Sequence, residues 1–138
     1  MPDALSYEAR RAHMRRIRSA NTQPELRVRR LAHAMGFRFR LHRRSLPGKP
    51  DLVFPRFRKV IFVHGCFWHQ HPGCGRASTP KSHTDYWLPK LQHNRDRDEA
   101  AAIALAALGW DVAVIWECET SDVAALAVHL QAFLGGQP

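Results

Sequence analysis

Apolar residues recur along the chain with two spacings, and each spacing predicts one kind of element. In residues 21–36, NTQPELRVRRLAHAMG, they lie three and four positions apart, as on one face of a helix. Thr22 fits the N-cap, Glu25 the capping-box position and Gly36 the C-terminal stop. We therefore predict a helix here, and its core stripe consists of Val28, Leu31, Ala32 and Met35.

The middle of the chain has the pattern of strands. Residues 37–42, FRFRLH, alternate as a half-buried strand does. A turn is predicted at 46–50, LPGKP. Residues 51–54 and 59–64 are apolar runs separated by PRFR, which predicts a strand, a tight turn and a fully buried strand. Residues 111–116, DVAVIW, predict another buried strand.

Two more helices are predicted in the second half of the chain. One covers residues 84–109, with Pro89 in an early turn or at a kink. The other covers residues 121–134, and its apolar face consists of Val123, Leu126, Leu130 and Phe133. The order helix, three strands, helix, strand, helix predicts an α/β fold.

The length of the chain predicts its number of domains, and its charge predicts the kind of partner that it binds. A chain of 138 residues with 45% hydrophobic residues is enough for one core, so we expect a single domain over residues 1–138. Residues 1–60 hold 16 basic and 4 acidic residues, whereas residues 61–138 hold 5 basic and 8 acidic ones. Most of the basic residues are arginines, whose planar fork suits phosphate. The expected partner is a polyanion, and a solvated basic face is the alternative.

The first 20 residues form a basic arm. Residues 7–18 could form a helix, but its apolar stripe, Met14 and Ile17, is thin. We therefore expect residues 1–20 to become ordered on a bound partner. Because no stretch is apolar for long enough to span a membrane and no signal-peptide pattern is present, we expect no membrane association and a cytoplasmic location.

Cysteine and histidine gather in the loop that follows the strand at 59–64. Cys66, His71 and Cys74 lie within nine residues of one another, and Cys118 follows the strand at 111–116. A single contact in the fold could complete a Cys₃His tetrahedron, which is a structural zinc pattern. Three unrelated buried thiols are the alternative. A reducing cytoplasm disfavours disulfides, so we favour zinc.

A second metal could lie at Asp51, which follows LPGKP at the start of a strand. A carboxylate at this position could hold Mg²⁺. Restriction-type nucleases place a Pro-Asp pair at such a site and usually supply an acidic residue and a lysine from the next strand. Here that strand ends in Val63 and His64, so a backbone carbonyl and histidines would have to substitute.

Three motifs together resemble one known family. LPGKPD at 46–51, HGCFWHQH at 64–71 and WECE at 116–119 resemble the very-short-patch repair (Vsr) mismatch endonucleases, over roughly residues 10–120. The resemblance implies a restriction-endonuclease-like fold, with a central mixed sheet flanked by helices and a structural zinc site. It also implies a Mg²⁺-dependent nick on the 5′ side of the mispaired thymine in T·G pairs, which arise when 5-methylcytosine deaminates.

Two other functions remain as alternatives, namely a restriction-type double-strand endonuclease and a non-catalytic, zinc-stabilised DNA-binding module. The expected partner is double-stranded DNA with a T·G mismatch, with contacts to mismatch-repair proteins also possible. We expect a monomer, since a monomer would cut one strand only.

The resemblance assigns catalytic roles by residue. Asp51 and the main-chain carbonyl of Val63 would ligate Mg²⁺. His69 would be the general base on the attacking water, and His64 would assist at the scissile phosphate. Glu25 has two interpretations, one as a helix cap and one facing the sheet, where it would support the metal-bound water or His69.

The resemblance also assigns residues to DNA. Wedging of apolar rings between base steps is known chemistry, and here it would be performed by Phe67, Trp68 and Trp87. Lys90 and Asn94 share a helix face with Trp87, at i, i+3 and i+7, and would contact the mismatch. Met14 and Ile17 would belong to an arm that approaches from the minor groove. Ordinary core aromatics and a solvated helix are the alternative.

Two positions depart from the family pattern. Val63 stands where threonine is expected, which keeps the main-chain carbonyl but removes a hydroxyl. Pro72 and Gly73 separate His71 from Cys74 by one residue more than expected. The remaining histidines are interpreted as ordinary polar residues, and these are His13, His33, His42, His83, His93 and His129.

Overall fold

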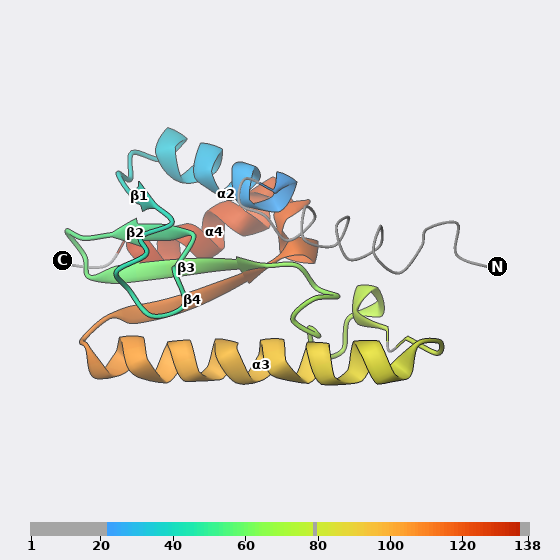
Figure 1. The fold of residues 1–138 in the computed structure, drawn as a ribbon. Helices are drawn as coiled ribbons and strands as arrows, with labels where there is room; N and C mark the ends of the chain where they lie inside the picture. Colours follow the sequence, from blue (N-terminus) through green and yellow to red (C-terminus); the bar gives the residue numbers. More distant parts are fainter. Residues whose placement is uncertain (1–21, 79, 136–138) are drawn as a thin grey trace.

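The computed structural model describes residues 22–78 and 80–135 (Figure 1). Its helices are α2 (Gln23–Ala34), α3 (Thr84–Ala107) and α4 (Val123–Leu134), and its strands are β1 (Arg40–Leu41), β2 (Leu52–Phe54), β3 (Lys59–His64) and β4 (Asp111–Trp116). Two short 3₁₀ helices, η1 (Gly75–Ala77) and η2 (Glu117–Thr120), complete the described elements. The predicted order of helices and strands is confirmed. The basic arm at 1–20, with Met14 and Ile17, lies outside the described residues.

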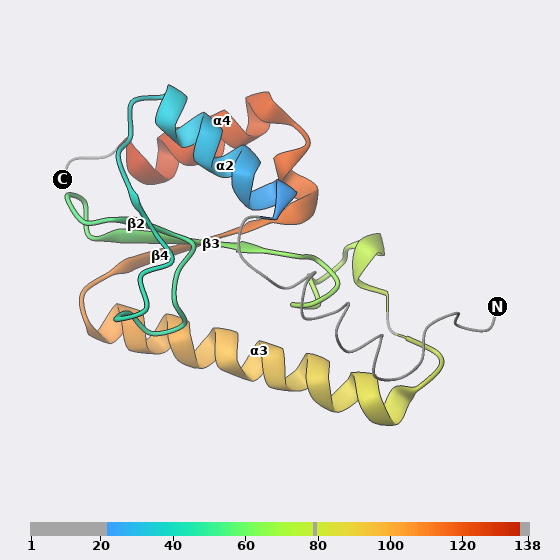
Figure 2. The ribbon, with the colours of Figure 1, turned by 45° about the horizontal axis from the view of Figure 1, so that its top comes forward.

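The four strands form one mixed sheet in the order β1-β2-β3-β4. The first three are antiparallel, and β4 runs parallel to β3 after the α3 crossover. Two views show that α2 and α4 cover one face of this sheet and α3 covers the other (Figures 1 and 2). A mixed α/β fold with a flanked central sheet is thus confirmed, whereas its membership of the restriction-endonuclease-like class stays a prediction.

Alternation along the strands divides the core between these two faces. Leu52, Phe54 and Ile61 pack with α2 and α4, whereas Val53 and Val60 pack toward α3. At the end of β3 the same alternation sends Val63 toward α2 and α4 and places His64 against the α3 side. The two consecutive residues that end this strand therefore face opposite layers.

The apolar face of α4 differs from the predicted one. Leu126, Leu130 and Leu134 recur every four residues and are buried, and Phe133 packs beside them. Val123 shares the helix face of the three leucines, as predicted, but it is 61% exposed because it is the first residue of α4 and the core does not cover it.

The chain between α2 and β2 is less regular than predicted. The strand expected at 37–42 is reduced to β1. Phe37 and Phe39 still pack against the core, but His42 has a φ of 46°, which ends the extended conformation. In the following turn Gly48 has a φ of 73°, and a Cβ there would lie 2.6 Å from the Cβ of Ala101. Glycine lets this turn approach α3 and so fixes the start of β2.

The ends of α2 follow the predicted signals. Thr22 caps α2, since its side chain accepts a hydrogen bond from the Glu25 N–H at 3.4 Å, and Gly36 follows the helix at a φ of 94°. Asp122 caps α4 in the same way. Pro89 lies inside α3, which continues past it. None of the helices among the described residues is both long and apolar enough to cross a membrane.

Candidate active site and metal centre

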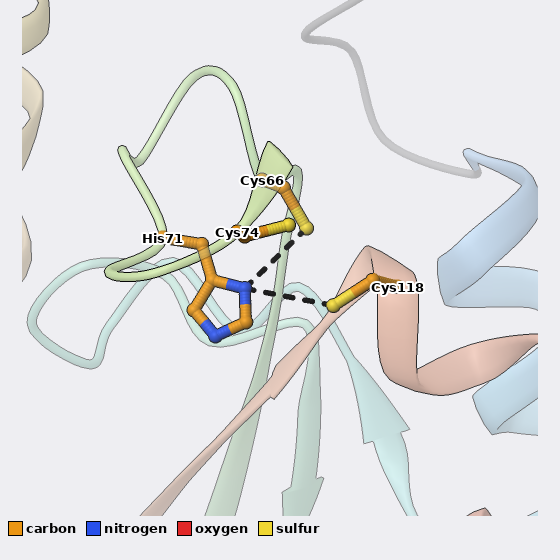
Figure 3. Close-up of side chains that lie close together, drawn as sticks. All are labelled: Cys66, His71, Cys74 and Cys118. Carbon is orange, nitrogen blue, oxygen red and sulfur yellow. Dashed lines mark hydrogen bonds between the residues drawn. The ribbon is translucent and has the colours of Figure 1, made fainter. Parts of the chain in front are cut away.

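The four predicted zinc ligands lie together (Figure 3). The loop after β3 supplies Cys66, His71 and Cys74, and Cys118 comes from η2, which follows β4. The Nδ1 atom of His71 is 3.7 Å from the Cys66 sulfur and 3.5 Å from the Cys118 sulfur. One ligand atom from each residue lies within 4.8 Å of all the others. The extra residue between His71 and Cys74 does not prevent this meeting.

The spacing of this cysteine group suits zinc. Bond lengths of about 2.3 Å to sulfur and about 2.0–2.1 Å to nitrogen give a tetrahedron whose sulfur–nitrogen edge is roughly 3.6 Å. The two measured sulfur–nitrogen distances are close to that value. Burial raises the pKa of the Cys66 thiol to about 12, so a lone thiolate is disfavoured there. A cation at the centre is the means by which proteins hold such thiolates deprotonated.

Neighbouring side chains hold the cysteine group in place. The ring of His71 stacks on Trp116, with centroids 4.2 Å apart and planes 10° apart. The N–H of Cys66 donates to Glu117 Oε1 at 3.3 Å. Both contacts join the loop after β3 to the end of β4, so the loop is anchored at the point where the two parallel strands finish.

A cavity of about 460 Å³ opens beside this loop, between α2, the end of β3 and α3. All four predicted catalytic side chains line it: Glu25, Asp51, His64 and His69. Val63 lines it as well. These residues come from α2, the position before β2, the end of β3 and the loop after β3, and the fold brings them to one place.

One side of the cavity is acidic. Asp51 Oδ2 accepts a hydrogen bond from the Val63 N–H at 2.7 Å. Glu25 is 2% exposed, and its Oε2 lies 2.7 Å from His42 Nε2 and 3.5 Å from Arg29 Nη1. Its carboxylate therefore faces the site, although its N–H also takes part in capping α2. Burial, together with the nearby Glu25, raises the pKa of Asp51 to about 7.

The other side of the cavity holds the histidines. His69 Nδ1 lies 2.5 Å from Asp98 Oδ2, and the His69 ring stacks on His64 with centroids 3.8 Å apart. His64 is 7% exposed, and its Nδ1 is buried without a hydrogen-bond partner in the described part of the chain. Burial, reinforced by His69, lowers the pKa of His64 to about 4. His64 is therefore neutral at physiological pH.

An aromatic group lies over the N-terminal half of α3. Phe67 contacts the rings of Trp68 and Trp87 edge-on at 5.3 and 5.2 Å between centroids, and all three are half-buried. The ammonium of Lys90 is 5.8 Å from the ring centroid of Tyr86. These rings pack on one another beside the cavity rather than inside the two cores of the sheet.

Asn94 is less accessible than a base-reading residue would be. Only 3% of it is exposed, and its Nδ2 donates to the carbonyl of Trp68 at 3.1 Å. Its Oδ1 accepts from Arg97 Nη2 at 2.8 Å. In this arrangement the Asn94 amide holds the aromatic loop, the part of the loop after β3 that carries Phe67 and Trp68, against α3. Contact between Asn94 and a base would require both hydrogen bonds to be exchanged.

Comparison with known proteins places this site in a family. A family model described as DNA mismatch endonuclease Vsr matches residues 2–75. A type II nicking enzyme from Xanthomonas oryzae, V.XorIIP, is 57% identical over 134 residues, which cover 97% of this chain and 98% of the relative. The chain belongs to the Vsr family. The DNA mismatch endonuclease Vsr of Escherichia coli is 41% identical over 118 residues, covering 86% of this chain and 75% of the relative. The nicking enzyme V.NmeAIP of Neisseria meningitidis is 40% identical over 124 residues, covering 90% and 88%.

Two residues of this Vsr-family site were missed by the sequence analysis. Asp98 was not considered, although it lies four residues after Asn94 and three before Ala101 on the face of α3 that turns inward. A carboxylate on that face was the available signal. His42 was interpreted as an ordinary polar residue, but it contacts Glu25 in the cavity. Only the pairing of β1 with β2 brings it there, since its N–H donates to the Asp51 carbonyl.

Proposed function

We propose that this protein is a mismatch endonuclease that makes a Mg²⁺-dependent nick on the 5′ side of the mispaired thymine in a T·G pair. The observation that carries the proposal is that Asp51, His64 and His69 line the same cavity. The relatives named as nicking enzymes and as a mismatch endonuclease support the reaction class. The excess of basic residues in the first 60 positions supports DNA as the substrate.

Asp51 and the Val63 carbonyl are the proposed ligands of Mg²⁺. The N–H and C=O of a strand residue point to the same side of the strand. Because the Val63 N–H bonds Asp51, its carbonyl is directed to the same side as that carboxylate. The chemistry that Mg²⁺ supplies when bound is charge neutralisation at a phosphate and acidification of water. A raised pKa at Asp51 fits a carboxylate that is fully charged only beside a cation.

His69 is the proposed general base. Its Nδ1 faces Asp98, so the proton of the neutral ring lies on Nδ1 and Nε2 is left to accept a proton from water. Asp98 would hold this tautomer and stabilise the imidazolium that forms, as a carboxylate does behind other catalytic histidines. Asp98 is thus a positioning residue, since it acts through His69.

His64 and Glu25 have supporting roles. A histidine that stays neutral can donate one hydrogen bond to a phosphate oxygen, and burial keeps His64 neutral. Glu25 is a buried carboxylate close to Asp51, where it would orient water at the cation. The cysteine group, with zinc bound, would hold the loop that carries His69 and the aromatic residues without taking part in the chemistry.

Recognition of the mismatch is proposed to use the aromatic loop. Phe67, Trp68 and Trp87 would enter the base stack beside the T·G pair, where stacking is weaker than in intact duplex. Lys90 and Asn94 would contact the mismatched bases after the loop has moved. The cost of opening a step is a few kcal/mol, so deformability would contribute to specificity.

The test uses end-labelled duplexes that carry T·G or C·G at one position, with the zinc-loaded protein and with or without added Mg²⁺. Expected is a nick in the thymine strand of the T·G duplex alone, immediately 5′ of the mispaired thymine, and only with Mg²⁺. Cleavage of both strands would indicate a restriction-type enzyme instead. Binding without any cleavage would indicate a DNA-binding module.

A variant tests the recognition step separately. Phe67→Ala combined with Trp68→Ala should weaken binding to the T·G duplex much more than binding to the C·G duplex, because the wedge contributes where the stack opens. Both affinities are measured by titration. If the double variant keeps the wild-type preference for the mismatch, these aromatic residues serve packing only.

A further inference from the structure

His42 lies closer to the proposed cation site than an ordinary surface histidine would. Its Nε2 is 2.7 Å from Glu25 Oε2 and 3.9 Å from Asp51 Oδ1. One ligand atom from each of these three residues lies within 4.8 Å of the other two. Glu25 comes from α2, whereas His42 directly follows β1 and Asp51 directly precedes β2, so the fold and not local sequence brings the three together.

The backbone at His42 is held in an uncommon conformation. Its φ of 46° is in the left-handed region, which non-glycine residues rarely adopt. The hydrogen bond from its N–H to the Asp51 carbonyl, at 3.2 Å, fixes it opposite Asp51. Conformations of this kind persist where the surroundings enforce them, and they gather at functional sites. In this conformation the ring lines the cavity.

We propose that His42 is a further protein ligand of the cation at Asp51, and that its nitrogen makes the site favour a first-row transition cation such as Mn²⁺ over Mg²⁺. The proposal rests on the proposed function for the presence of a cation at Asp51. In an octahedral site with bonds of about 2.0–2.1 Å, adjacent ligands are about 3 Å apart and opposite ones about 4 Å apart. The 3.9 Å between His42 Nε2 and Asp51 Oδ1 fits opposite ligands, and the 2.7 Å between His42 Nε2 and Glu25 Oε2 fits adjacent ones. Under this proposal Glu25 therefore contacts the cation directly in place of orienting a water.

The ligand set carries the preference. Mg²⁺ takes oxygen ligands almost exclusively, whereas imidazole suits transition cations. A site with carboxylates and a carbonyl alone would bind Mn²⁺ and Mg²⁺ with affinities that differ only modestly. A ring nitrogen widens the difference in affinity, because it strengthens binding of Mn²⁺ and adds little to binding of Mg²⁺.

The competing explanation is that His42 only positions Glu25 through a hydrogen bond. Glu25 Oε2 already lies 3.5 Å from Arg29 Nη1, so it has a cationic neighbour without His42. A positioning role would alter the affinities for Mn²⁺ and Mg²⁺ together. A ligand role would alter mainly the affinity for Mn²⁺, so the ratio of the two affinities separates the explanations.

The experiment measures cation binding to zinc-loaded protein without DNA, so its readout does not depend on nicking. Bound Mn²⁺ is followed by electron paramagnetic resonance, and Mg²⁺ affinity is obtained by competition. We expect His42→Gln to weaken Mn²⁺ binding about tenfold and Mg²⁺ binding less than about twofold, since an amide oxygen replaces the ring nitrogen. Pulsed spectra of bound Mn²⁺ should show coupling to a nitrogen nucleus in the wild type and lose it in this variant.

Three further variants make the result decisive. His42→Asn repeats the change with a residue that tolerates the left-handed backbone, in case glutamine disturbs the fold. His69→Gln should retain the nitrogen coupling, because His69 lies with Asp98 on the other side of the cavity. Asp51→Asn should lose both cations. An unchanged ratio of affinities and an unchanged nitrogen coupling in both His42 variants would overturn the proposal.

Nicking of T·G duplex, measured in parallel, keeps the two proposals separable. Nitrogen coupling that depends on His42, in a protein that does not nick T·G duplex, would support the metal site and contradict the proposed function. Nicking with a ratio insensitive to both His42 variants would leave the proposed function intact and remove His42 from the ligands.

Discussion

The cysteine group and the acidic group of Glu25, His42 and Asp51 are both able to hold a metal, yet they are built in opposite ways. The cysteine group offers three thiolates and an imidazole at tetrahedral spacing, which leaves no position for water. The acidic group offers two carboxylates and an imidazole at the wall of a cavity of about 460 Å³. A closed group can hold a loop, whereas an open one can bind a substrate and water beside its cation.

The two groups also connect different parts of the fold. The cysteine group joins the loop after β3 to the end of β4. The acidic group joins α2 to the connection between β1 and β2, and it lies across the cavity from His64 and His69. Removing the first should therefore release the aromatic loop, and removing the second should stop the chemistry while the loop stays in place. The predictions below test that separation.

The largest effect is expected at Asp51. Asp51→Asn keeps the shape of the side chain but removes the charge that would hold Mg²⁺, so nicking should fall to background. Binding to T·G duplex and the zinc content should remain near wild-type values, because the cysteine group and the aromatic loop are untouched. Single-turnover nicking and a binding titration measure the two quantities.

A matched control for this change is Asp111→Asn, at the exposed start of β4, which alters the net charge equally. It should nick at the wild-type rate. If Asp51→Asn nicks at more than a few per cent of that rate, the carboxylate does not hold the catalytic cation, and the acidic group is not the catalytic metal site.

The next effect is expected at the histidine side of the cavity. His69→Gln should lower the nicking rate by about 10²–10⁴-fold if His69 is the general base. Asp98→Asn should lower it by roughly tenfold to a hundredfold, since it disturbs the tautomer without removing the base. Asp96→Asn, two residues earlier on the exposed side of α3, is the control and should have no effect. A loss below tenfold at His69 would assign the base to another residue.

The strands and the proposed metal ligands could be predicted from different features of the sequence. β3 and β4 were predicted with their observed bounds, because strands of a sheet that helices cover on both faces are continuous apolar runs. The burial predicted for β4 is reached only at Ile115, since its other residues are half-buried or exposed. The cysteine group was predicted from ligand type and number alone. Asp51 was proposed as a cation ligand from its position after LPGKP, and the family motifs then assigned Asp51, His64 and His69 together. Their meeting in one cavity depends on the pairing of β2 with β3.

What the sequence did not reveal depends on tertiary contacts. Asp98 faces His69 only because α3 crosses beneath the end of β3. The inward face of α3 that contains Asp98 also includes the polar Asn94, so the sequence shows no continuous apolar stripe there. His42 looked like part of a strand, but its left-handed backbone turns it toward Glu25. In both cases the side chain is polar and its role follows from the element opposite, which a single sequence does not specify.

The third prediction concerns the cysteine group. Cys118→Ser should lose zinc and lower the free energy of unfolding by roughly 3 kcal/mol, because the loop after β3 is then no longer joined to η2. Zinc content is measured by metal analysis and stability by urea unfolding. Cys118→His, which offers a different zinc ligand of the Cys₂His₂ type, should retain most of the metal. Unchanged zinc content and stability in Cys118→Ser would show that the four side chains meet without binding zinc.

The smallest effect concerns His64, which lies between the two groups at the end of β3. Its pKa is about 4 in the folded protein, because of burial first and His69 second, against about 6.5 in an unfolded chain. Between these values the unfolded chain binds more protons than the folded one, so stability is full above pH 6.5 and falls as the pH is lowered toward 4. The loss attributable to His64 should reach about 2–3 kcal/mol near pH 4.

His64→Gln removes this titration, so its stability should decline less than that of the wild type between pH 6.5 and pH 4. His93→Gln, at an exposed position on α3, should decline as the wild type does. The zinc ligands also protonate at low pH, but both variants and the wild type share that contribution, and the difference between their urea unfolding curves isolates His64. An equal decline in His64→Gln and the wild type would mean that folding does not lower the pKa of His64. Burial would then not be what keeps His64 neutral at the scissile phosphate.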